Sequence, residues 1–204
     1  MNPAEAVKVR KRLNTYNMVA NLSWSVVCLL PVSVFCYSFL SGKLFCIFLL
    51  LSMLSVLLPK RFLNQLSVKR TKRFYQKAGV VFINRFTQNG AIINRLVRKK
   101  YPAYKMIFKT DYSINKLLQQ TYMQEKFHCL LLLFFIFCSV CAFMENKAMW
   151  AFVIIITNII YNFYPILLQH YIRMRLINLD KKNAYAKKTV AHSKAKPSSK
   201  PVFF

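Results

Sequence analysis

Acidic residues and glycines are scarce in this sequence. Its 204 residues include five Asp or Glu and three Gly, against 31 Lys or Arg. A metal centre in a helical bundle needs carboxylate ligands from several helices, so we expect no metal site. With three dispersed glycines, the chain has neither a Gly-rich phosphate-binding loop nor a GxSxG nucleophile motif. It therefore lacks the signatures of P-loop nucleotide binding and of α/β-hydrolases.

Apolar residues, by contrast, make up 56% of the chain and gather in long uncharged runs. A helix that crosses a bilayer needs about 20 such residues. The runs at 19–40, 127–144 and 148–168 approach or reach that length, whereas the run at 44–58 is shorter. Short polar connections join these runs in pairs. We therefore predict an all-α integral membrane protein with about four transmembrane helices in two hairpins, at 19–58 and 127–168.

Two features of these runs limit other interpretations. The first run is longer than the ~7–15-residue apolar core of a secretory signal, so we expect it to be retained as an anchor. All six cysteines lie within the apolar runs, where a thiol packs as a small hydrophobic side chain. No disulfide framework is therefore expected.

Positive charge lies almost entirely in three segments, 1–18, 59–126 and 169–204, whereas the two hairpin connections hold only Lys43 and Lys147. Short loops rich in Lys and Arg stay in the cytoplasm. We therefore predict a multi-pass protein of the cell (inner) membrane with both termini cytoplasmic. Because the basic residues border the apolar runs, anionic membrane lipids are the expected partners, and nucleic acid is not.

The two longer basic segments differ in composition. Residues 59–126 mix basic with aromatic and aliphatic side chains, which is typical of helices that lie on the headgroup layer. Gly79, Gly90 and Pro102 are expected to break this basic segment into short helices. The tail 169–204 becomes rich in Lys and Ser, so we expect it to be disordered after about residue 180.

A first candidate site lies where the third run begins. Asp111 and Ser113 are possible helix caps, and no Pro or Gly interrupts residues 114–143, so one long helix is predicted there. Ile114, Leu117, Leu118 and Thr121 recur along it at spacings of three and four residues, and Glu125 and His128 continue the same face. A carboxylate beside an imidazole can orient the ring while its free nitrogen removes a proton. The same spacing also suits a simple interfacial ion pair.

A second candidate site follows in the fourth run. Polar residues and a proline recur there at helical spacing and should face the bundle or a cavity: Asn158, Asn162, Pro165, Gln169 and Arg173. Hydrogen bonds between helices would explain the asparagines equally well. Arg173 and Arg175 could bind a phosphate or carboxylate, or extend toward lipid phosphates, and His170 lies at the same boundary.

These residues resemble the glycosyl-4,4'-diaponeurosporenoate acyltransferase family, most strongly over residues 113–179. Thr121, Glu125 and His128 match its pattern Glu-Thr-x-Arg-Ala-Glu-x-x-His-Trp, and the stretch from Pro165 through residues 169–175 is similar to its Pro…Gln-Arg-Tyr-Asn-Arg-x-Arg ending. His170 stands where that pattern has Arg, and Cys129 stands where it has Trp.

The resemblance implies transfer of a fatty acyl group to a sugar hydroxyl of a glycosylated carotenoid. It implies a lipid acceptor and an acyl thioester co-substrate, on coenzyme A or an acyl carrier protein, with no further cofactor. His128 and Glu125 would be catalytic, and five further residues would bind substrate: Asn162, Gln169, His170, Arg173 and Arg175.

Two other functions remain to be weighed against an enzyme. In a non-catalytic adaptor or scaffold that binds anionic lipid or a protein partner, Glu125, His128 and Arg173 should point apart. In an enzyme they should converge at one depth. A transporter is disfavoured because the runs are few, without repeats, and carry no charge within the membrane.

Overall fold

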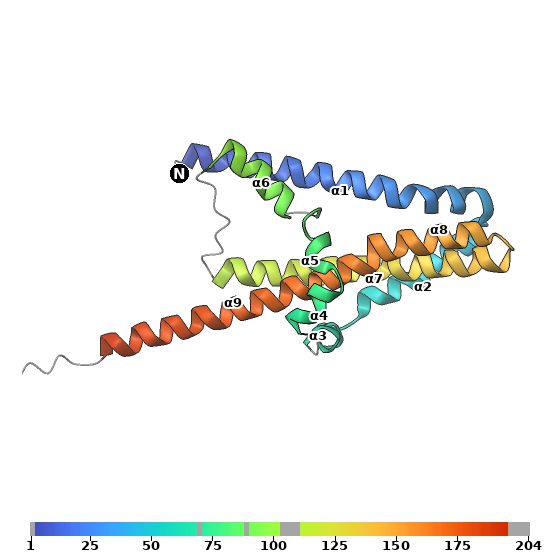
Figure 1. Ribbon diagram of the computed structural model, residues 1–204. Helices are drawn as coiled ribbons and strands as arrows, with labels where there is room; N and C mark the ends of the chain where they lie inside the picture. Colours follow the sequence, from blue (N-terminus) through green and yellow to red (C-terminus); the bar gives the residue numbers. More distant parts are fainter. Residues whose placement is uncertain (1–2, 69–70, 88–89, 103–110, 196–204) are drawn as a thin grey trace, which may run out of the picture.

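The computed structural model describes residues 3–68, 71–87, 90–102 and 111–195, which are helical and contain no strand (Figure 1). The predicted all-α class is therefore confirmed. Helix α1 (Pro3–Phe39) turns through Ser41 into α2 (Gly42–Met53), which tightens into the 3₁₀ turn η1 (Leu54–Leu57). Ser41 caps α2, because its Oγ accepts a hydrogen bond from the Leu44 N–H at 3.4 Å. This is the first hairpin.

The second hairpin consists of α7 (Asp111–Met144) followed by α8 (Ala148–Asn158), η2 (Ile159–Phe163) and α9 (Tyr164–Ala195). Its turn is made by Asn146, which adopts a left-handed φ of 58°. Asparagine tolerates this conformation better than most residues. The Lys147 N–H then donates to the Ala142 carbonyl at 2.8 Å and closes the end of α7.

Three helical stretches are long and apolar enough to cross a membrane: Ala4–Phe39, Ile114–Met144 and Ala148–Tyr185. The fourth apolar helix, Gly42–Leu57, is shorter than the ~20 residues that a full span requires. Pro59 follows it and helps to end it. It lies against α7 as part of the bundle, so the predicted four spans correspond to three long helices and one short helix.

A single apolar core joins both hairpins. Phe35 on α1, Phe135 and Cys138 on α7, and Ile154 on α8 are fully buried in this core. The Trp150 ring packs on the Phe35 ring at a tilt of 47°, with the two centroids 6.1 Å apart. The six cysteines are all free thiols, as expected for side chains that serve as apolar packing.

The described residues of the basic segment between the hairpins form four short helices, α3 (Lys60–Val68), α4 (Lys72–Lys77), α5 (Val80–Ile83) and α6 (Ala91–Lys100). The predicted breaks at Gly79 and Gly90 are confirmed, and α6 ends at Lys100, two residues before Pro102. Gly79 adopts a left-handed φ of 73°, and Gly90 precedes α6 where a Cβ would lie 2.3 Å from the Asn84 carbonyl oxygen. Tyr75 packs on Tyr171 of α9, with ring centroids 5.8 Å apart.

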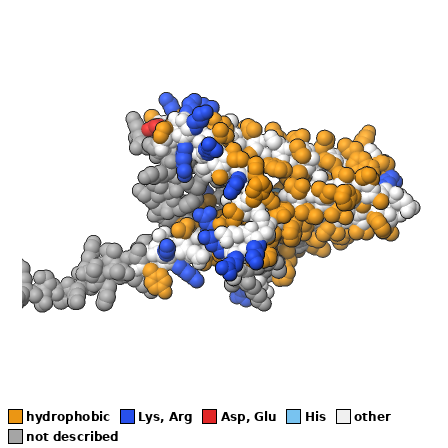
Figure 2. Space-filling view, in the orientation of Figure 1, with side chains coloured by type: hydrophobic (Ala, Val, Ile, Leu, Met, Phe, Trp, Pro, Cys, Tyr) orange, Lys and Arg blue, Asp and Glu red, His pale blue; other side chains and the backbone are white. Residues whose placement is uncertain are grey.

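Charge is concentrated at one end of the molecule. Figure 2 shows Lys and Arg side chains gathered around α3–α6 and the beginning of α1, whereas apolar side chains dominate the visible face of the rest of the bundle. Lys147 lies at the opposite end, where its Nζ contacts Glu145 at 2.9 Å and the Phe39 ring at 4.6 Å from the centroid. This distribution is the one that the sequence predicted.

The expected disorder after about residue 180 is wrong up to Ala195, because α9 continues to that residue. No Pro or Gly occurs between Ile166 and Lys196, and the intervening Ala and Lys residues favour helix. Residues 196–204 lie outside the described part of the chain. So do the side chains of Asp111 and Ser113, the expected caps of α7.

Candidate functional site

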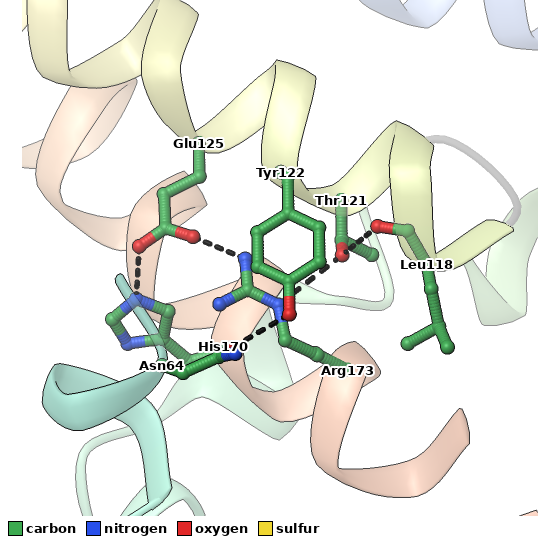
Figure 3. Close-up of polar contacts among 7 residues, drawn as sticks. All are labelled: Asn64, Leu118, Thr121, Tyr122, Glu125, His170 and Arg173. Atoms are coloured by element: carbon green, nitrogen blue, oxygen red, sulfur yellow. Dashed lines mark hydrogen bonds and ion pairs between the residues drawn. The ribbon is translucent and has the colours of Figure 1, made fainter. Parts of the chain in front are cut away.

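Glu125 is the centre of a buried ionic cluster between α7 and α9. Its Oε1 accepts a hydrogen bond from His170 Nε2, and its Oε2 accepts one from Arg173 Nη2 (Figure 3). Glu125 is 0% exposed, Arg173 1% and His170 3%. A carboxylate this deeply buried requires charged or hydrogen-bonding partners. The cluster therefore holds α9 to α7 as well as providing functional groups.

Arg173 makes two further contacts that fix its guanidinium. Its Nε donates to Thr121 Oγ1 at 3.3 Å, and its Cζ lies 3.8 Å from the centroid of the Tyr122 ring. Tyr122 in turn donates its hydroxyl hydrogen to Asn64 Oδ1 of α3 at 2.6 Å (Figure 3). The basic segment between the hairpins is thus linked to the ionic cluster through the Tyr122 side chain.

Tyr122 and Asn64 were missed by sequence reasoning. Tyr122 had a local signal, because it lies one helical turn before Glu125 and so shares its face. Asn64 had none, because 58 residues separate it from Tyr122 and no spacing rule connects them.

The predicted pairing of Glu125 with His128 is wrong. Although the two residues share a side of α7, the Glu125 carboxylate turns to the His170 and Arg173 side chains on α9. His128 instead faces η2, where its Nδ1 lies 3.4 Å from Asn162 Oδ1. The opposite charge of Arg173 on the facing helix is a stronger partner for a buried carboxylate than an imidazole one turn away.

The partners of His128 have a defined hydrogen-bond polarity. Asn158 Nδ2 donates to the Leu132 carbonyl at 3.1 Å, which can only accept. Asn158 Oδ1 therefore accepts from Asn162 Nδ2, at 2.8 Å, and Asn162 presents its Oδ1 to His128. His128 Nδ1 must then be the donor, which leaves Nε2 with the lone pair.

His128 lies where three helical segments meet. Its ring is edge-on to the Tyr161 ring, with centroids 5.8 Å apart, and the Tyr161 hydroxyl contacts Ser25 of α1 at 2.7 Å. Tyr161 and Asn162 belong to η2, a π-helical turn in which the Tyr164 N–H bonds to the Ile159 carbonyl. Pro165, which lacks an N–H, follows directly. π-turns inside helices are frequent at functional sites.

The other candidate residues divide into two groups. Asn158, Asn162, Gln169 and Arg173 are all buried, which confirms that the polar stripe faces the bundle. Arg175 is exposed, and its Cζ lies 5.8 Å from the centroid of the Tyr171 ring, so the structure does not bring it to the ionic cluster. Among the described residues, no group of three or more His, Cys, Asp or Glu side chains is placed to hold a metal ion.

A comparison with protein families finds that the family model of glycosyl-4,4'-diaponeurosporenoate acyltransferase matches residues 59–182, more than half of the chain. The chain belongs to this family. The match extends further toward the N-terminus than the sequence motifs indicated and includes Asn64, the ionic cluster and the residues Leu132, Asn158 and Asn162 that are bonded in series to His128. Comparisons with curated proteins and with solved structures find no match. As a glycosyl-4,4'-diaponeurosporenoate acyltransferase family member, the chain is an acyltransferase of the carotenoid-glycoside class.

Proposed function

We propose that the protein transfers a fatty acyl group from an activated thioester to a sugar hydroxyl of a carotenoid glycoside, with His128 as general base. The observation that carries this proposal is the polar relay from the Leu132 carbonyl through Asn158 and Asn162. It makes Nδ1 of the half-buried imidazole the donor, so that the lone pair that can accept a proton lies on Nε2, within the region that matches the family.

The reaction needs one proton acceptor that later becomes a donor. A free hydroxyl is a poor nucleophile near neutral pH, and a positioned base contributes about 10²–10⁴-fold to the rate. Nε2 takes the hydroxyl proton as the sugar oxygen attacks the thioester carbonyl, forming a tetrahedral oxyanion. Collapse breaks the carbon–sulfur bond, and the leaving thiolate takes the proton back from the imidazolium. The 3.4 Å contact of Nδ1 with Asn162 can shorten as positive charge develops on the ring.

Glu125 has a different role from the one that the sequence suggested. Its two bonds to His170 and Arg173 fix the relative depth of α7 and α9. His128 lies three residues further along α7, and Asn162 lies on the chain just before α9. Glu125 is therefore a positioning residue, because the ionic cluster sets the register in which His128 meets Asn162.

The arrangement also suits the two substrates. The lipid acceptor would approach from the apolar surface of the bundle, and the donor, on coenzyme A or an acyl carrier protein, would approach from the basic end (Figure 2). The same basic end would bind anionic lipid headgroups and, by the charge rule, face the cytoplasm together with both termini of the chain.

The test is acylation of a carotenoid glycoside in membranes that contain His128→Ala, His128→Gln or wild-type protein at matched levels. Mass spectrometry of the lipid extract reports the mass added to the acceptor. We expect the acylated product to fall by at least about 100-fold in both variants. Met123→Ala is the matched control, because Met123 lies on the same helix but is 66% exposed.

Normal acylation by both His128 variants would refute the assignment of the base. An unchanged lipid extract when the gene is removed would instead favour the adaptor or scaffold that binds anionic lipid, for which the basic end is the supporting observation.

A further inference from the structure

Two nitrogen atoms in the ionic cluster are buried without a hydrogen-bond partner: His170 Nδ1 and Arg173 Nη1. They belong to side chains that are each more than nine-tenths buried, three residues apart on α9, and both bonded to Glu125 through their other nitrogens. In Figure 3, the imidazole and the guanidinium lie next to each other on the side of Glu125 that faces away from α7. Buried polar atoms normally have partners, so this pair indicates a binding position.

The charges of the cluster indicate which kind of group fits. Arg173 already neutralises the Glu125 carboxylate, and a second positive charge on His170 would be uncompensated in a buried site. The neutral ring donates its Nε2 hydrogen to Glu125, so its Nδ1 carries a lone pair. The position therefore offers one hydrogen-bond acceptor, Nδ1, and one donor, Arg173 Nη1.

A hydroxyl group is the complement of this pair, because it donates one hydrogen bond and accepts another. A phosphate or a carboxylate only accepts, and it would face the lone pair on Nδ1. An apolar group would leave both nitrogens unpaired, at a cost that increases with burial. The pair thus selects a neutral hydroxyl over an anion.

We infer that His170 Nδ1 and Arg173 Nη1 form a subsite for one hydroxyl of the sugar on the acceptor lipid. This inference rests on the proposed function, since it names a second contact of the same acceptor. Glu125 and His128 are three residues apart, a rise of about 4.5 Å along α7. Because a sugar carries several hydroxyls, one bound at this subsite leaves another to face His128, and the subsite selects which hydroxyl is acylated.

The test measures binding of radiolabelled octyl β-glucoside, a minimal lipid glycoside, to the full chain in nanodiscs prepared without sugar detergents. Empty nanodiscs give the background from partitioning into lipid. His170→Gln can keep the bond to Glu125 through its amide but lacks the ring acceptor. Arg173→Lys keeps the positive charge but lacks Nη1. Met123→Ala is again the control.

We expect about tenfold weaker binding of octyl glucoside to His170→Gln and Arg173→Lys than to wild type. A panel of four monodeoxy analogues, each lacking one ring hydroxyl, identifies the contact. The analogue that lacks the bound hydroxyl should bind wild type about tenfold more weakly than octyl glucoside does. The same analogue should bind His170→Gln as tightly as it binds wild type. The other three should lose affinity on substitution as octyl glucoside does.

Equal binding of octyl glucoside by wild type and His170→Gln would overturn the subsite. A loss that is the same for all four analogues would also overturn it, because that pattern reports altered helix packing. No acyl donor is present, so the result is independent of whether the His128 variants remain active.

Discussion

The ionic cluster supports a quantitative prediction about stability. In Glu125→Gln, the amide keeps one acceptor but turns an N–H₂ group toward His170 or Arg173, both of which donate in wild type. Arg173, 1% exposed, then carries a buried charge without its counter-ion. Removing one partner of a buried ion pair costs about 3–5 kcal/mol. We expect Glu125→Gln to be destabilised by an amount in this range.

The double variant Glu125→Gln with Arg173→Met separates the charge effect from packing. Methionine fills much of the volume of the arginine side chain and needs no counter-ion, and a buried pair replaced on both sides by neutral groups often has little net cost. The double variant should therefore be more stable than Glu125→Gln alone, although it carries one more substitution. The two single effects should not add.

Unfolding in mixed micelles with increasing SDS, followed by circular dichroism, measures these free energies in the full chain. Met123→Ala, on the exposed face of α7, should stay within about 0.5 kcal/mol of wild type. The reasoning is refuted if Glu125→Gln unfolds at the wild-type SDS fraction. It is also refuted if the loss in free energy of unfolding in the double variant equals the sum of the losses in Glu125→Gln and Arg173→Met.

Three further predictions follow from the structure. Asn162→Leu should lower the acylation rate about tenfold or more at unchanged protein level, because His128 Nδ1 loses its acceptor and the ring loses its preferred tautomer. Kinetic assays in membranes measure this rate, and a wild-type rate would contradict the prediction. Tyr122→Phe should lower the free energy of unfolding by about 0.5–1.5 kcal/mol, because it removes the hydrogen bond to Asn64. Tyr122→Leu should lower it further, because the aromatic ring beside Arg173 is also lost. SDS unfolding of both variants compares the two contacts, and equal stability would exclude a cation–π contribution. A cysteine at Ser41 should react with an impermeant maleimide in intact cells and one at Gln76 should not, since both are exposed but lie at opposite ends of the bundle; the reverse pattern would invert the proposed topology.

The parts that could be predicted from the sequence depend on local periodicity. The helix face shared by Asn158, Asn162, Gln169 and Arg173 follows from successive spacings of four, seven and four residues, and all four side chains are buried. The hairpins follow from the length of the apolar runs, and the breaks at Gly79 and Gly90 follow from backbone conformation.

What could not be predicted concerns partners on different elements. Glu125 has His128 one turn away, but its partners lie 45 and 48 residues further along, and spacing alone does not show which side chains of another helix face it. The long helix after Asp180 was missed for another reason. A composition rich in Lys and Ser suggested disorder, whereas the absence of helix breakers up to Lys196 decided the outcome.

Helix α9 also has a mechanical consequence. Its 32 residues make a continuous rod of about 48 Å, longer than the ~30 Å hydrocarbon layer. Arg173 lies in the tenth position of this helix, and no Pro or Gly separates it from the Lys-rich end. A rotation or tilt of the far end of α9 is therefore transmitted along the same helix to the buried Arg173 guanidinium. A bulky protein fused after Ala195 would therefore disturb the contact between Arg173 and Glu125, although it is attached far from that contact.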